Sequence, residues 1–272
     1  MPELPEVEVV KQGLEQILKE QPTLKKVELM RPDLREPIPL KKLNKLVGEP
    51  VTSVSRRAKY LQIWTPKGGL LSHLGMTGTW RVAAPGEERA HDHVYLHFVG
   101  GLRLAYRDPR RFGYLDYIGP DETLTHPKLR ALGPEPLSSD FNGEVLWEKL
   151  QERSSAVKVA IMDQKVVVGV GNIYASEALH AAGIRPVLPA HKVSRARADI
   201  LATEIKKILT LAIESGGSSI SDFAQADGQS GYFQTNFRVY AREGEACPSC
   251  GRAVKSQILG GRNTFWCSHC QK

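Results

Sequence analysis

The sequence predicts an α+β fold in which strands and helices occupy different parts of the chain. Alternating apolar and polar residues fill much of the stretch 24–118, helical periodicity dominates after about residue 136, and all four cysteines lie near the C-terminus. Segregation of strands and helices along a chain is typical of α+β proteins. With 272 residues, the chain is long enough for two domains with cores of their own.

The composition is that of a globular protein with an excess of positive charge. Apolar residues make up 41% and charged residues 25% of the chain, and 37 Lys and Arg outnumber 30 Asp and Glu. Of the net charge of +7, +4 falls in residues 238–272, which hold six basic and two acidic residues. This distribution favours a polyanionic partner. No apolar run has the length of a membrane span and the N-terminus lacks a signal-peptide layout, so we expect neither a membrane nor a secreted location.

The N-terminal half begins with one helix and continues as strands. Residues 5–18 place apolar side chains at helical spacing. The runs VYLHF (94–98) and LRLAY (102–106) alternate on either side of Gly100 and Gly101, which predicts a β-hairpin. Further strand-like runs cover 51–64 and 69–82.

The C-terminal half is predicted to be mostly helical. The proline-rich stretch 120–136 has the composition of a domain connection. One helix is predicted from Asn172, a candidate N-cap, to Gly183, and a longer one over 194–215. The polar, glycine-containing stretch 218–234 is then a long loop, and long loops in compact domains are often functional.

The four cysteines predict one zinc site. Cys247 and Cys250 form CPSC, and Cys267 and Cys270 form CSHC after sixteen intervening residues. Two such pairs are typical of a tetrahedral zinc site, and an all-thiolate set leaves no open position, so the zinc is predicted to be structural. The alternatives are two disulfides, which are rare without a secretion signal, or a redox pair, which needs only one motif. His269 inside the second pair is a fifth candidate ligand.

The opening MPELPEVEVV raises the question of a catalytic N-terminus. Pro2 is small enough for Met1 to be removed, which would leave a secondary amine with a pKa near 8. Such an amine attacks an aldehyde or acetal-like carbon and gives a cationic imine. Glu3 could donate or accept a proton, and Glu6 follows one helical turn later. The alternative is an ordinary helix start, where proline and acidic residues are favoured.

Two turns carry side chains suited to opening a DNA duplex. SHLGMTG presents Met76, and DPRRFG presents Arg110 and Phe112. Apolar side chains inserted at base steps unstack DNA, and arginine binds base edges. The alternative is that Met76 and Phe112 are core residues.

Two further motifs suit phosphate binding. SRRAKY, residues 55–60, is a basic cluster, for which the alternative is a solvated charged surface. The glycines before Asn172 predict backbone N–H groups at a helix N-terminus, which is an anion site. Such glycines also occur in ordinary turns.

Together these segments resemble the formamidopyrimidine-DNA glycosylase family, the bacterial 8-oxoguanine DNA glycosylases with lyase activity. The matching blocks run in family order from the second residue to the last few. They are PELPEVE from Pro2, RAKY ending at Tyr60, HLGMTG from His73, HDH from His91, DPRRFG from Asp108, MDQK from Met162, VGVGNIYASE from Val168, GYFQ from Gly231, VYAREGE from Val239, and the four cysteines with GRNT from Gly261.

The resemblance implies three domains and a DNA substrate. These are an N-terminal β-sandwich with its leading helix (1–132), a helix–two-turns–helix domain (133–236) whose loop 218–234 covers the flipped base, and a zinc finger (237–272). The implied partner is double-stranded DNA with oxidised purines or abasic sites, bound in the cleft between the two halves. The implied enzyme is a monomer of the bacterial cytoplasm, located at the nucleoid through DNA binding.

The resemblance also implies a bifunctional mechanism. Pro2 attacks C1′ of the damaged nucleoside, the base leaves, and β- and δ-elimination nick the strand. Glu3 protonates the sugar ring oxygen and Glu6 supports the site. Lys59 matches the lysine assigned to β-elimination and phosphate contact, and Arg262 the zinc-finger arginine assigned to δ-elimination.

The implied DNA contacts fall into two groups. Met76, Arg110 and Phe112 fill the void left by the flipped base, with Arg110 facing the orphaned cytosine. The remaining contacts to DNA, mostly to phosphates, are His73, His91, Arg153, Lys158 and Asn172. Thr77 is assigned no base-reading role, and an effect of Gln229 and Ser230 on substrate preference stays open.

Three other hypotheses compete with this one. The endonuclease VIII-like branch has the same architecture and prefers oxidised pyrimidines, but PELPEVE, the long 218–234 loop and the DPRRF turn favour the formamidopyrimidine branch. A DNA-binding zinc protein without catalysis would not need Pro2 and Glu3. An N-terminal-proline tautomerase is a much smaller chain and has no use for a basic zinc tail.

Overall fold

The computed structural model describes residues 1–218 and 233–272. By packing, the chain forms two compact units: Met1–Arg130 with Ser215–Tyr232, and Ala131–Glu214 with Phe233–Lys272. The predicted α+β class is confirmed, because the strands of the sandwich lie in the first unit and most of the described helices in the second. The three-domain division stays a prediction, since packing units are not a measure of independent folding.

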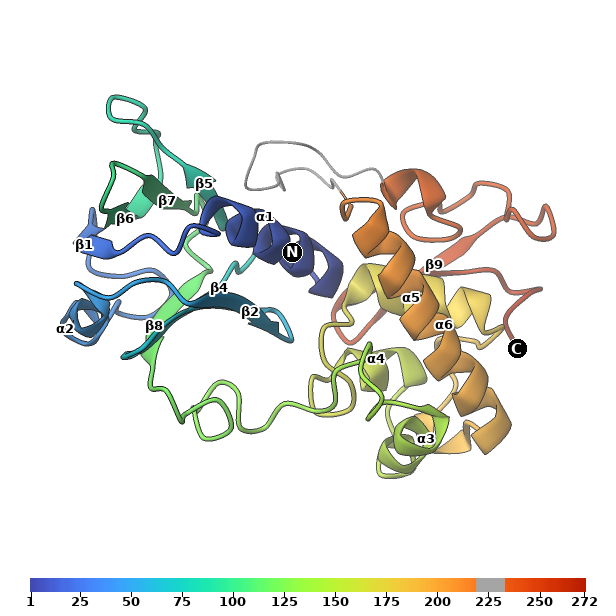
Figure 1. Cartoon of the computed structure of the whole chain (residues 1–272). Coiled ribbons are helices and arrows are strands. Elements are labelled where there is room, and N and C mark those ends of the chain that lie inside the picture. The colour runs from blue at the N-terminus through green and yellow to red at the C-terminus, as the bar shows by residue number, and fades with distance from the viewer. Residues whose placement is uncertain (219–232) are drawn as a thin grey trace. The chain divides into compact units, whose positions relative to one another are not determined.

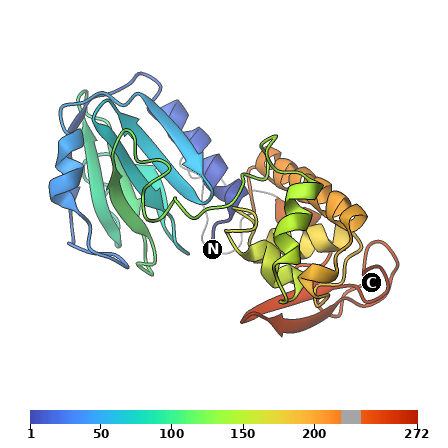
Figure 2. The same ribbon diagram turned by 90° about the horizontal axis from the view of Figure 1, so that it is seen from below.

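The first unit is a β-sandwich of two four-stranded antiparallel sheets, one ordered β1-β6-β7-β5 and the other β2-β3-β4-β8. Figures 1 and 2 show the two sheets as layers, with helix α1 alongside β2. The elements of this unit are α1 (Leu4–Ile17), β1 (Leu24–Leu29), α2 (Leu40–Leu43), a 3-10 turn (Asn44–Leu46), β2 (Ser53–Arg57), β3 (Tyr60–Thr65), β4 (Gly68–His73), β5 (Thr79–Val82), β6 (Asp92–Phe98), β7 (Arg103–Arg107) and β8 (Tyr114–Ile118).

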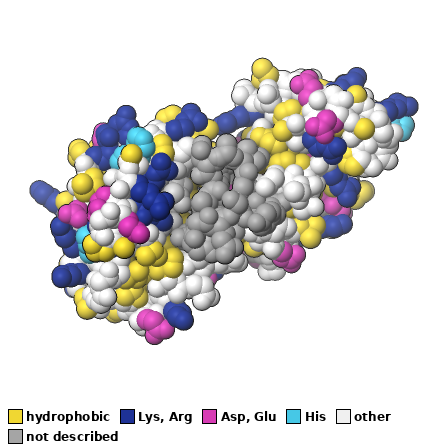
Figure 3. Space-filling view, turned by 90° about the horizontal axis from the view of Figure 1, so that it is seen from above, with side chains coloured by type: hydrophobic (Ala, Val, Ile, Leu, Met, Phe, Trp, Pro, Cys, Tyr) yellow, Lys and Arg dark blue, Asp and Glu magenta, His cyan; other side chains and the backbone are white. Residues whose placement is uncertain are grey.

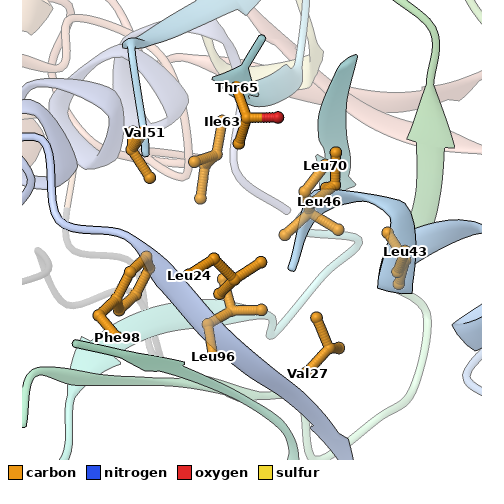
Figure 4. Close-up of a pocket in the computed structure, with 10 residues that line it drawn as sticks. All are labelled: Leu24, Val27, Leu43, Leu46, Val51, Ile63, Thr65, Leu70, Leu96 and Phe98. Atoms are coloured by element: carbon orange, nitrogen blue, oxygen red, sulfur yellow. The ribbon is translucent and has the colours of Figure 1, made fainter. Parts of the chain in front are cut away.

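The core of this unit lies between the two sheets. Side chains from β1 and β6 face those from β3 and β4 across an apolar interior, which α2 closes at one end (Figure 4). Thr65 is the one residue with a side-chain hydroxyl in this lining, and its Oγ1 donates to the Gly68 carbonyl at 3.0 Å. Burial of this apolar surface, at about 25 cal/mol per Å², is the main stabilising term of the sandwich.

The strand-like run 69–82 does not form one sheet. β4 and β5 belong to different sheets, and the turn 74–78 carries the chain from one layer to the other. The predicted hairpin over 94–106 is confirmed, with β6 pairing with β7 around Gly100 and Gly101, both at positive φ.

The second unit packs four helices around an apolar core. Helix α6 contacts α3 and α5, and the buried side chains include Tyr174, Leu201 and Leu209. Its elements are α3 (Gly143–Gln151), α4 (Val157–Met162), α5 (Asn172–Ala181), a 3-10 turn (Ala190–Lys192), α6 (Arg195–Glu214), a second 3-10 turn (Phe233–Asn236), β9 (Lys255–Leu259) and β10 (Arg262–Trp266).

Helix α5 begins one residue earlier than the cap candidate suggests. Gly171 is the N-cap, with extended backbone, and Asn172 is already helical. The prediction of Asn172 as N-cap is therefore wrong, and its side chain instead bonds to Lys158 and to the Asn263 carbonyl. Gly183 ends the helix as predicted, at φ +66.

The cysteine segment folds onto the same unit. β9 and β10 form an antiparallel hairpin that contacts α5 (Figure 2). The buried Glu177 of α5 accepts hydrogen bonds from the backbone N–H groups of Arg238, Val239 and Tyr240 at 2.8–3.0 Å. These bonds attach the chain that leads into the zinc segment to the helical core.

Among the described residues, no helix combines the length and the apolar character that a bilayer crossing requires.

Candidate active site

The N-terminus of α1 gathers the first three residues expected to carry the chemistry. Pro2 is buried immediately before the helix, and Glu3 is its N-cap residue. Glu6, in the first turn, accepts a hydrogen bond from the Glu3 N–H at 2.8 Å through Oε2. Both glutamates are only 2% exposed. The side chains of Glu3 and Glu6 each accept from the backbone N–H of the other, a capping box, and the helix dipole stabilises negative charge at this point.

The other oxygen of Glu6 binds the chain that follows α6. Oε1 accepts from both the N–H and the hydroxyl of Ser218, each at 2.9 Å. Ser218 is the first residue of the expected lid loop; residues 219–232, including Gln229 and Ser230, lie outside the described residues. Glu6 therefore joins the Pro2 end of the chain to the start of that loop. The sequence analysis missed Ser218, which is 212 residues from its partner.

Lys59 lies in the two-residue loop between β2 and β3, next to the pair Arg57–Tyr60. Ala58, the first loop residue, has φ +54. A positive φ suits a two-residue hairpin loop, although an alanine there costs about 1–2 kcal/mol. The Lys59 side chain is buried. The alternative of a solvated charged surface is therefore wrong for Lys59.

An ion pair holds this loop against α1. Arg56 Nε donates to Glu8 Oε2 at 2.7 Å, and its Nη1 donates to the Ala58 carbonyl at 2.9 Å. Both charged side chains are largely withdrawn from water, with 10% and 17% exposed. Because Glu8 lies on α1 and Arg56 precedes Lys59 by three residues, the pair fixes the Lys59 loop beside the helix.

His73 ends β4 beside this loop. Burial, and then nearby cations led by Lys59, lower the pKa of His73 to about 4. Its ring is therefore neutral at pH 7. Nδ1 accepts from the Gly75 N–H at 3.0 Å, so the remaining proton belongs on Nε2. His73 can donate one hydrogen bond to an anion but contributes no charge.

Met76, Arg110 and Phe112 lie on two turns that face each other in the same unit. Phe112 is 44% exposed, Arg110 is exposed and Met76 is half-buried. The Arg110 guanidinium stacks over the Phe112 ring at 4.8 Å from its centroid, a cation–π contact. The core alternative is therefore wrong for Phe112, because no packed interior covers its ring.

His91 stands on the loop between β5 and β6, exposed and at φ +73. The next residue, Asp92, holds this loop in place through its buried carboxylate. Its Oδ2 accepts from Arg81 Nη2 at 2.5 Å, the Arg89 N–H at 2.9 Å and the Tyr95 hydroxyl at 3.0 Å. The loop thus presents the His91 side chain on a fixed backbone.

Lys158 and Asn172 belong to the second unit and bond to each other. The Lys158 side chain is fully buried, and its Nζ donates to Asn172 Oδ1 and to Thr264 Oγ1, the latter at 2.9 Å. Asn172 Nδ2 donates to the Asn263 carbonyl at 3.0 Å. These bonds hold the β9–β10 hairpin whose first β10 residue is the exposed Arg262. A phosphate contact by Lys158 would require one of its bonds to be exchanged.

Arg153 lies two residues after the end of α3 and forms one ion pair. Its Nη2 donates to Asp163 Oδ2 at 3.1 Å, with 34% and 40% of the two side chains exposed. An ion pair this exposed is worth less than about 1 kcal/mol, so the guanidinium can exchange Asp163 for another anion at little cost.

The four cysteines fit a zinc ion. All four sulfurs lie within 4.8 Å of one another, and none of the four is in a disulfide. Zn–S bonds of about 2.3 Å place tetrahedral sulfurs about 3.8 Å apart, and the Cys247–Cys270 sulfurs are 3.9 Å apart. Burial raises the pKa of Cys267, but the backbone N–H groups of Cys270 and His269 lower it to about 7. The cysteines form one structural zinc site, and the two disulfides are excluded.

His180 of α5 touches this site and was missed by the sequence analysis. Its Nε2 lies 3.5 Å from Cys247 Sγ, and the side chain is buried. Burial lowers the pKa of His180 to about 4, so the ring is neutral and can donate one N–H to the sulfur. No spacing rule points to it, because it stands 67 residues before Cys247.

Basic side chains are spread over both units. Figure 3 shows Lys and Arg side chains on one face of each unit, mixed with hydrophobic and acidic ones. This pattern agrees with the excess of 37 basic over 30 acidic residues, which favours a polyanionic partner over a cationic or neutral one.

Three family descriptions match consecutive parts of the chain. The formamidopyrimidine-DNA glycosylase N-terminal domain matches residues 1–115 and the H2TH domain of the same enzyme matches residues 132–224. The zinc finger found in FPG and IleRS matches residues 244–272. Together they cover most of the sequence.

Known proteins resemble the chain over its whole length. The formamidopyrimidine-DNA glycosylase of Bdellovibrio bacteriovorus is 71% identical over 272 residues, covering 100% of both chains. Lactococcus lactis Fpg, solved with DNA containing an abasic site, has a TM-score of 0.91 at 33% identity and covers 99% of each chain. MutM in complex with DNA containing carbocyclic 8-oxo-G has a TM-score of 0.90 at 33% identity and covers 100% of each chain.

These findings agree with the family resemblance that the sequence motifs indicated. They are the full-length identity, the three family descriptions matched in sequence order and the four-cysteine zinc site. The chain belongs to the formamidopyrimidine-DNA glycosylase family, whose members are DNA glycosylases of DNA repair.

Proposed function

We propose that this chain is a bifunctional DNA glycosylase and abasic-site lyase that excises oxidised purines, namely 8-oxoguanine and formamidopyrimidines, from double-stranded DNA. The observation that carries the proposal is the buried Pro2–Glu3–Glu6 group at the N-terminus of α1. A nucleophilic amine next to a buried carboxyl group is the arrangement that imine chemistry at a sugar carbon requires. The DNA complexes of its relatives support the substrate class.

The first chemical step forms a covalent bond to Pro2. After removal of Met1, the lone pair of the proline nitrogen attacks C1′ and the bond between C1′ and the base breaks. The base leaves with that electron pair and takes up the proton that the proline nitrogen loses. Glu3 protonates O4′ as the C1′–O4′ bond opens, and an iminium ion joins Pro2 to C1′. The buried site removes competing water from the iminium carbon.

Strand cleavage follows from the iminium ion. Its positive charge acidifies the C2′ protons, and loss of one of them expels the 3′ phosphate. A second elimination expels the 5′ phosphate and leaves a one-nucleoside gap with phosphates at both ends. We assign Lys59 to the first elimination and Arg262 to the second. Glu6 acts by holding Glu3 and Ser218 in place.

The remaining assigned residues bind DNA. We propose phosphate contacts by Arg153 and Asn172, a neutral hydrogen bond from His73, and a contact from the exposed His91. Lys158 supports DNA binding by holding the β9–β10 hairpin through its ammonium. It contacts a phosphate itself only if the ammonium exchanges one of its present hydrogen bonds for that phosphate. We further propose that the protein works as a monomer at the nucleoid in a bacterial cytoplasm, and that residues 218–234 cover the flipped base.

Met76, Arg110 and Phe112 take the place of the flipped nucleotide. Flipping costs a few kcal/mol. Insertion of the half-buried Met76 and the exposed Phe112 between bases offsets part of that cost, and Arg110 supplies donors for the orphaned cytosine.

Borohydride trapping tests the proposal directly. The protein is incubated with a duplex carrying 8-oxoguanine opposite cytosine, reduced, and analysed by mass spectrometry to locate the crosslink. We expect a covalent adduct at Pro2, and no adduct with Pro2→Gly although that variant still binds the duplex. An adduct only with an oxidised pyrimidine would place the chain in the endonuclease VIII-like branch instead. Tight binding without any adduct would favour a non-catalytic DNA-binding protein.

A further inference from the structure

The turns 74–78 and 108–113 are in direct backbone contact. Gly75 has φ +63, and a Cβ on it would lie 2.4 Å from the Phe112 carbonyl carbon. A Cβ on Gly78 or Gly113 would lie 2.2 or 1.9 Å from the Tyr106 hydroxyl. No side chain fits at these three positions, so the two turns stack on each other and on the Tyr106 ring.

A single buried carboxylate joins the two turns. Asp108 is fully buried. Its Oδ1 accepts from the Thr77 hydroxyl at 2.6 Å, and its Oδ2 accepts from the Gly113 N–H at 2.7 Å. The Thr77 oxygen in turn accepts from the Arg110 N–H at 3.1 Å. Thr77 thus connects the Asp108 side chain to the Arg110 backbone, both in the second turn.

The backbone of the same aspartate reaches a third loop. The Asp108 N–H donates to the His91 carbonyl at 3.0 Å, and the Asp108 carbonyl lies 2.9 Å from His93 Nε2. The residues next to these anchors are the ones assigned to DNA: Met76 precedes Thr77, and Arg110 and Phe112 lie between Asp108 and Gly113. One residue therefore fixes three DNA-facing segments relative to one another.

We propose that Asp108, acting through the Thr77 hydroxyl, is a positioning residue that makes Met76, Arg110 and Phe112 insert into DNA as one rigid wedge. The inference rests on the proposed function, because it concerns how that enzyme opens its duplex. Neither side chain touches the reacting atoms.

Rigidity matters because the wedge works against base stacking. Unstacking a step costs a few kcal/mol. If the two turns could separate, Met76 and Phe112 would move apart and the bases would stay stacked. The flipped state would then be less populated. A hydrogen bond to a buried carboxylate is among the strong ones in a protein. Here one such bond, from Thr77 to Asp108, joins the two turns, and a second, from the Gly113 N–H, closes the second turn.

The test compares Thr77→Val with Thr77→Ser. Valine keeps the shape of threonine but removes the hydroxyl, whereas serine keeps the hydroxyl. The substrate is a duplex with 8-oxoguanine opposite cytosine and 2-aminopurine next to the lesion, so that the fluorescence rise reports unstacking in stopped flow. A second duplex places mismatches on both sides of the lesion, which lowers the cost of opening. Thermal unfolding of each variant verifies the fold, and Thr77→Ala replaces Thr77→Val should the latter not fold.

We expect Thr77→Val to slow both the fluorescence rise and single-turnover excision by about tenfold or more, the factor that one hydrogen bond to a charged group is worth, while Thr77→Ser stays within about twofold of wild type. On the mismatched duplex the valine defect should largely disappear. Equal rates for valine and wild type, an equal defect for serine and valine, or an undiminished defect on the mismatched duplex would each overturn the inference. Absence of excision by the wild-type protein would instead refute the proposed function, since the inference concerns only the difference between variants.

Discussion

Replacing Glu6 by glutamine should destabilise the start of α1 and the Ser218 segment by about 2–4 kcal/mol. The carboxylate accepts three hydrogen bonds, at 2.8 Å from the Glu3 N–H and at 2.9 Å from the N–H and the hydroxyl of Ser218. A glutamine has one accepting oxygen, so its NH₂ group must face either Glu3 or Ser218, both of which present an N–H.

The size of the destabilisation in Glu6→Gln follows from the hydrogen bonds that the variant loses or weakens. The better orientation keeps the oxygen on Ser218 and leaves the Glu3 N–H buried without this acceptor, which costs about 1–3 kcal/mol. The two retained bonds lose their charge assistance, and the helix dipole loses a carboxylate worth about 0.3–1 kcal/mol. A matched variant, Ser218→Ala, removes only the hydroxyl bond and should cost about 1 kcal/mol.

Native-state hydrogen exchange measures this effect where it occurs. In Glu6→Gln, the amides of the first turn of α1 and of Ser218 should exchange about 30- to 1,000-fold faster, which is the factor that 2–4 kcal/mol represents. Amides of the β6–β7 hairpin should be unchanged and serve as an internal control. Unchanged exchange, or a Ser218→Ala effect as large as that of Glu6→Gln, would refute the hydrogen-bond argument. Slower exchange would mean that repulsion between two buried carboxylates outweighs the bonds.

Four further predictions follow from the site. The pKa of His73 is lowered to about 4 by burial, so the unfolded chain binds more protons than the folded chain between pH 4 and 6.5. The free energy of unfolding should therefore fall by up to about 3 kcal/mol as the pH drops through this window. Denaturation of His73→Gln, measured at several pH values, should lack this dependence. Chelation of zinc should abolish DNA binding in a gel-shift assay, and tight binding by a sample verified as zinc-free would contradict the structural role. His180→Phe removes the donor near Cys247 and should release zinc to a colorimetric chelator about tenfold faster, while Glu148→Gln at the protein surface should not. Arg110→Ala should weaken binding to lesion duplexes, whereas Arg153→Ala should lower the slope of log Kd against log salt by about one, if it contacts one phosphate.

Local patterns predicted most of the secondary structure and the zinc site. The helical spacing over 5–18 corresponds to α1, and the alternation around Gly100 and Gly101 corresponds to the β6–β7 hairpin. The two Cys-x-x-Cys pairs predicted the metal because each pair is a short turn that supplies two thiolates at once. These signals succeed because the interacting residues lie within a few positions of each other.

Packing decides what local preference leaves open. The strand-like run 69–82 holds two strands, β4 and β5, that belong to two different sheets, because Gly75 and Gly78 let the chain cross between the layers. Asn172 has the chemistry of an N-cap, yet Gly171 takes that position while Asn172 bonds to Lys158 and Asn263. Local structural propensity allows several roles for a residue, and its tertiary contacts determine which role it takes.

The sequence by itself determined the α+β class, the zinc ligands and the family, because motifs such as PELPEVE and the cysteine pairs are short, specific and ordered along the chain. Only the tertiary structure decided that Glu6 binds Ser218, that Lys158 holds Thr264 and that Asp108 connects three loops. The physical reason is distance along the chain: the first two pairs are 212 and 106 residues apart. Such partners meet only when the unit that contains both has packed, and a buried carboxylate or ammonium then takes whichever donors or acceptors the packing brings within reach.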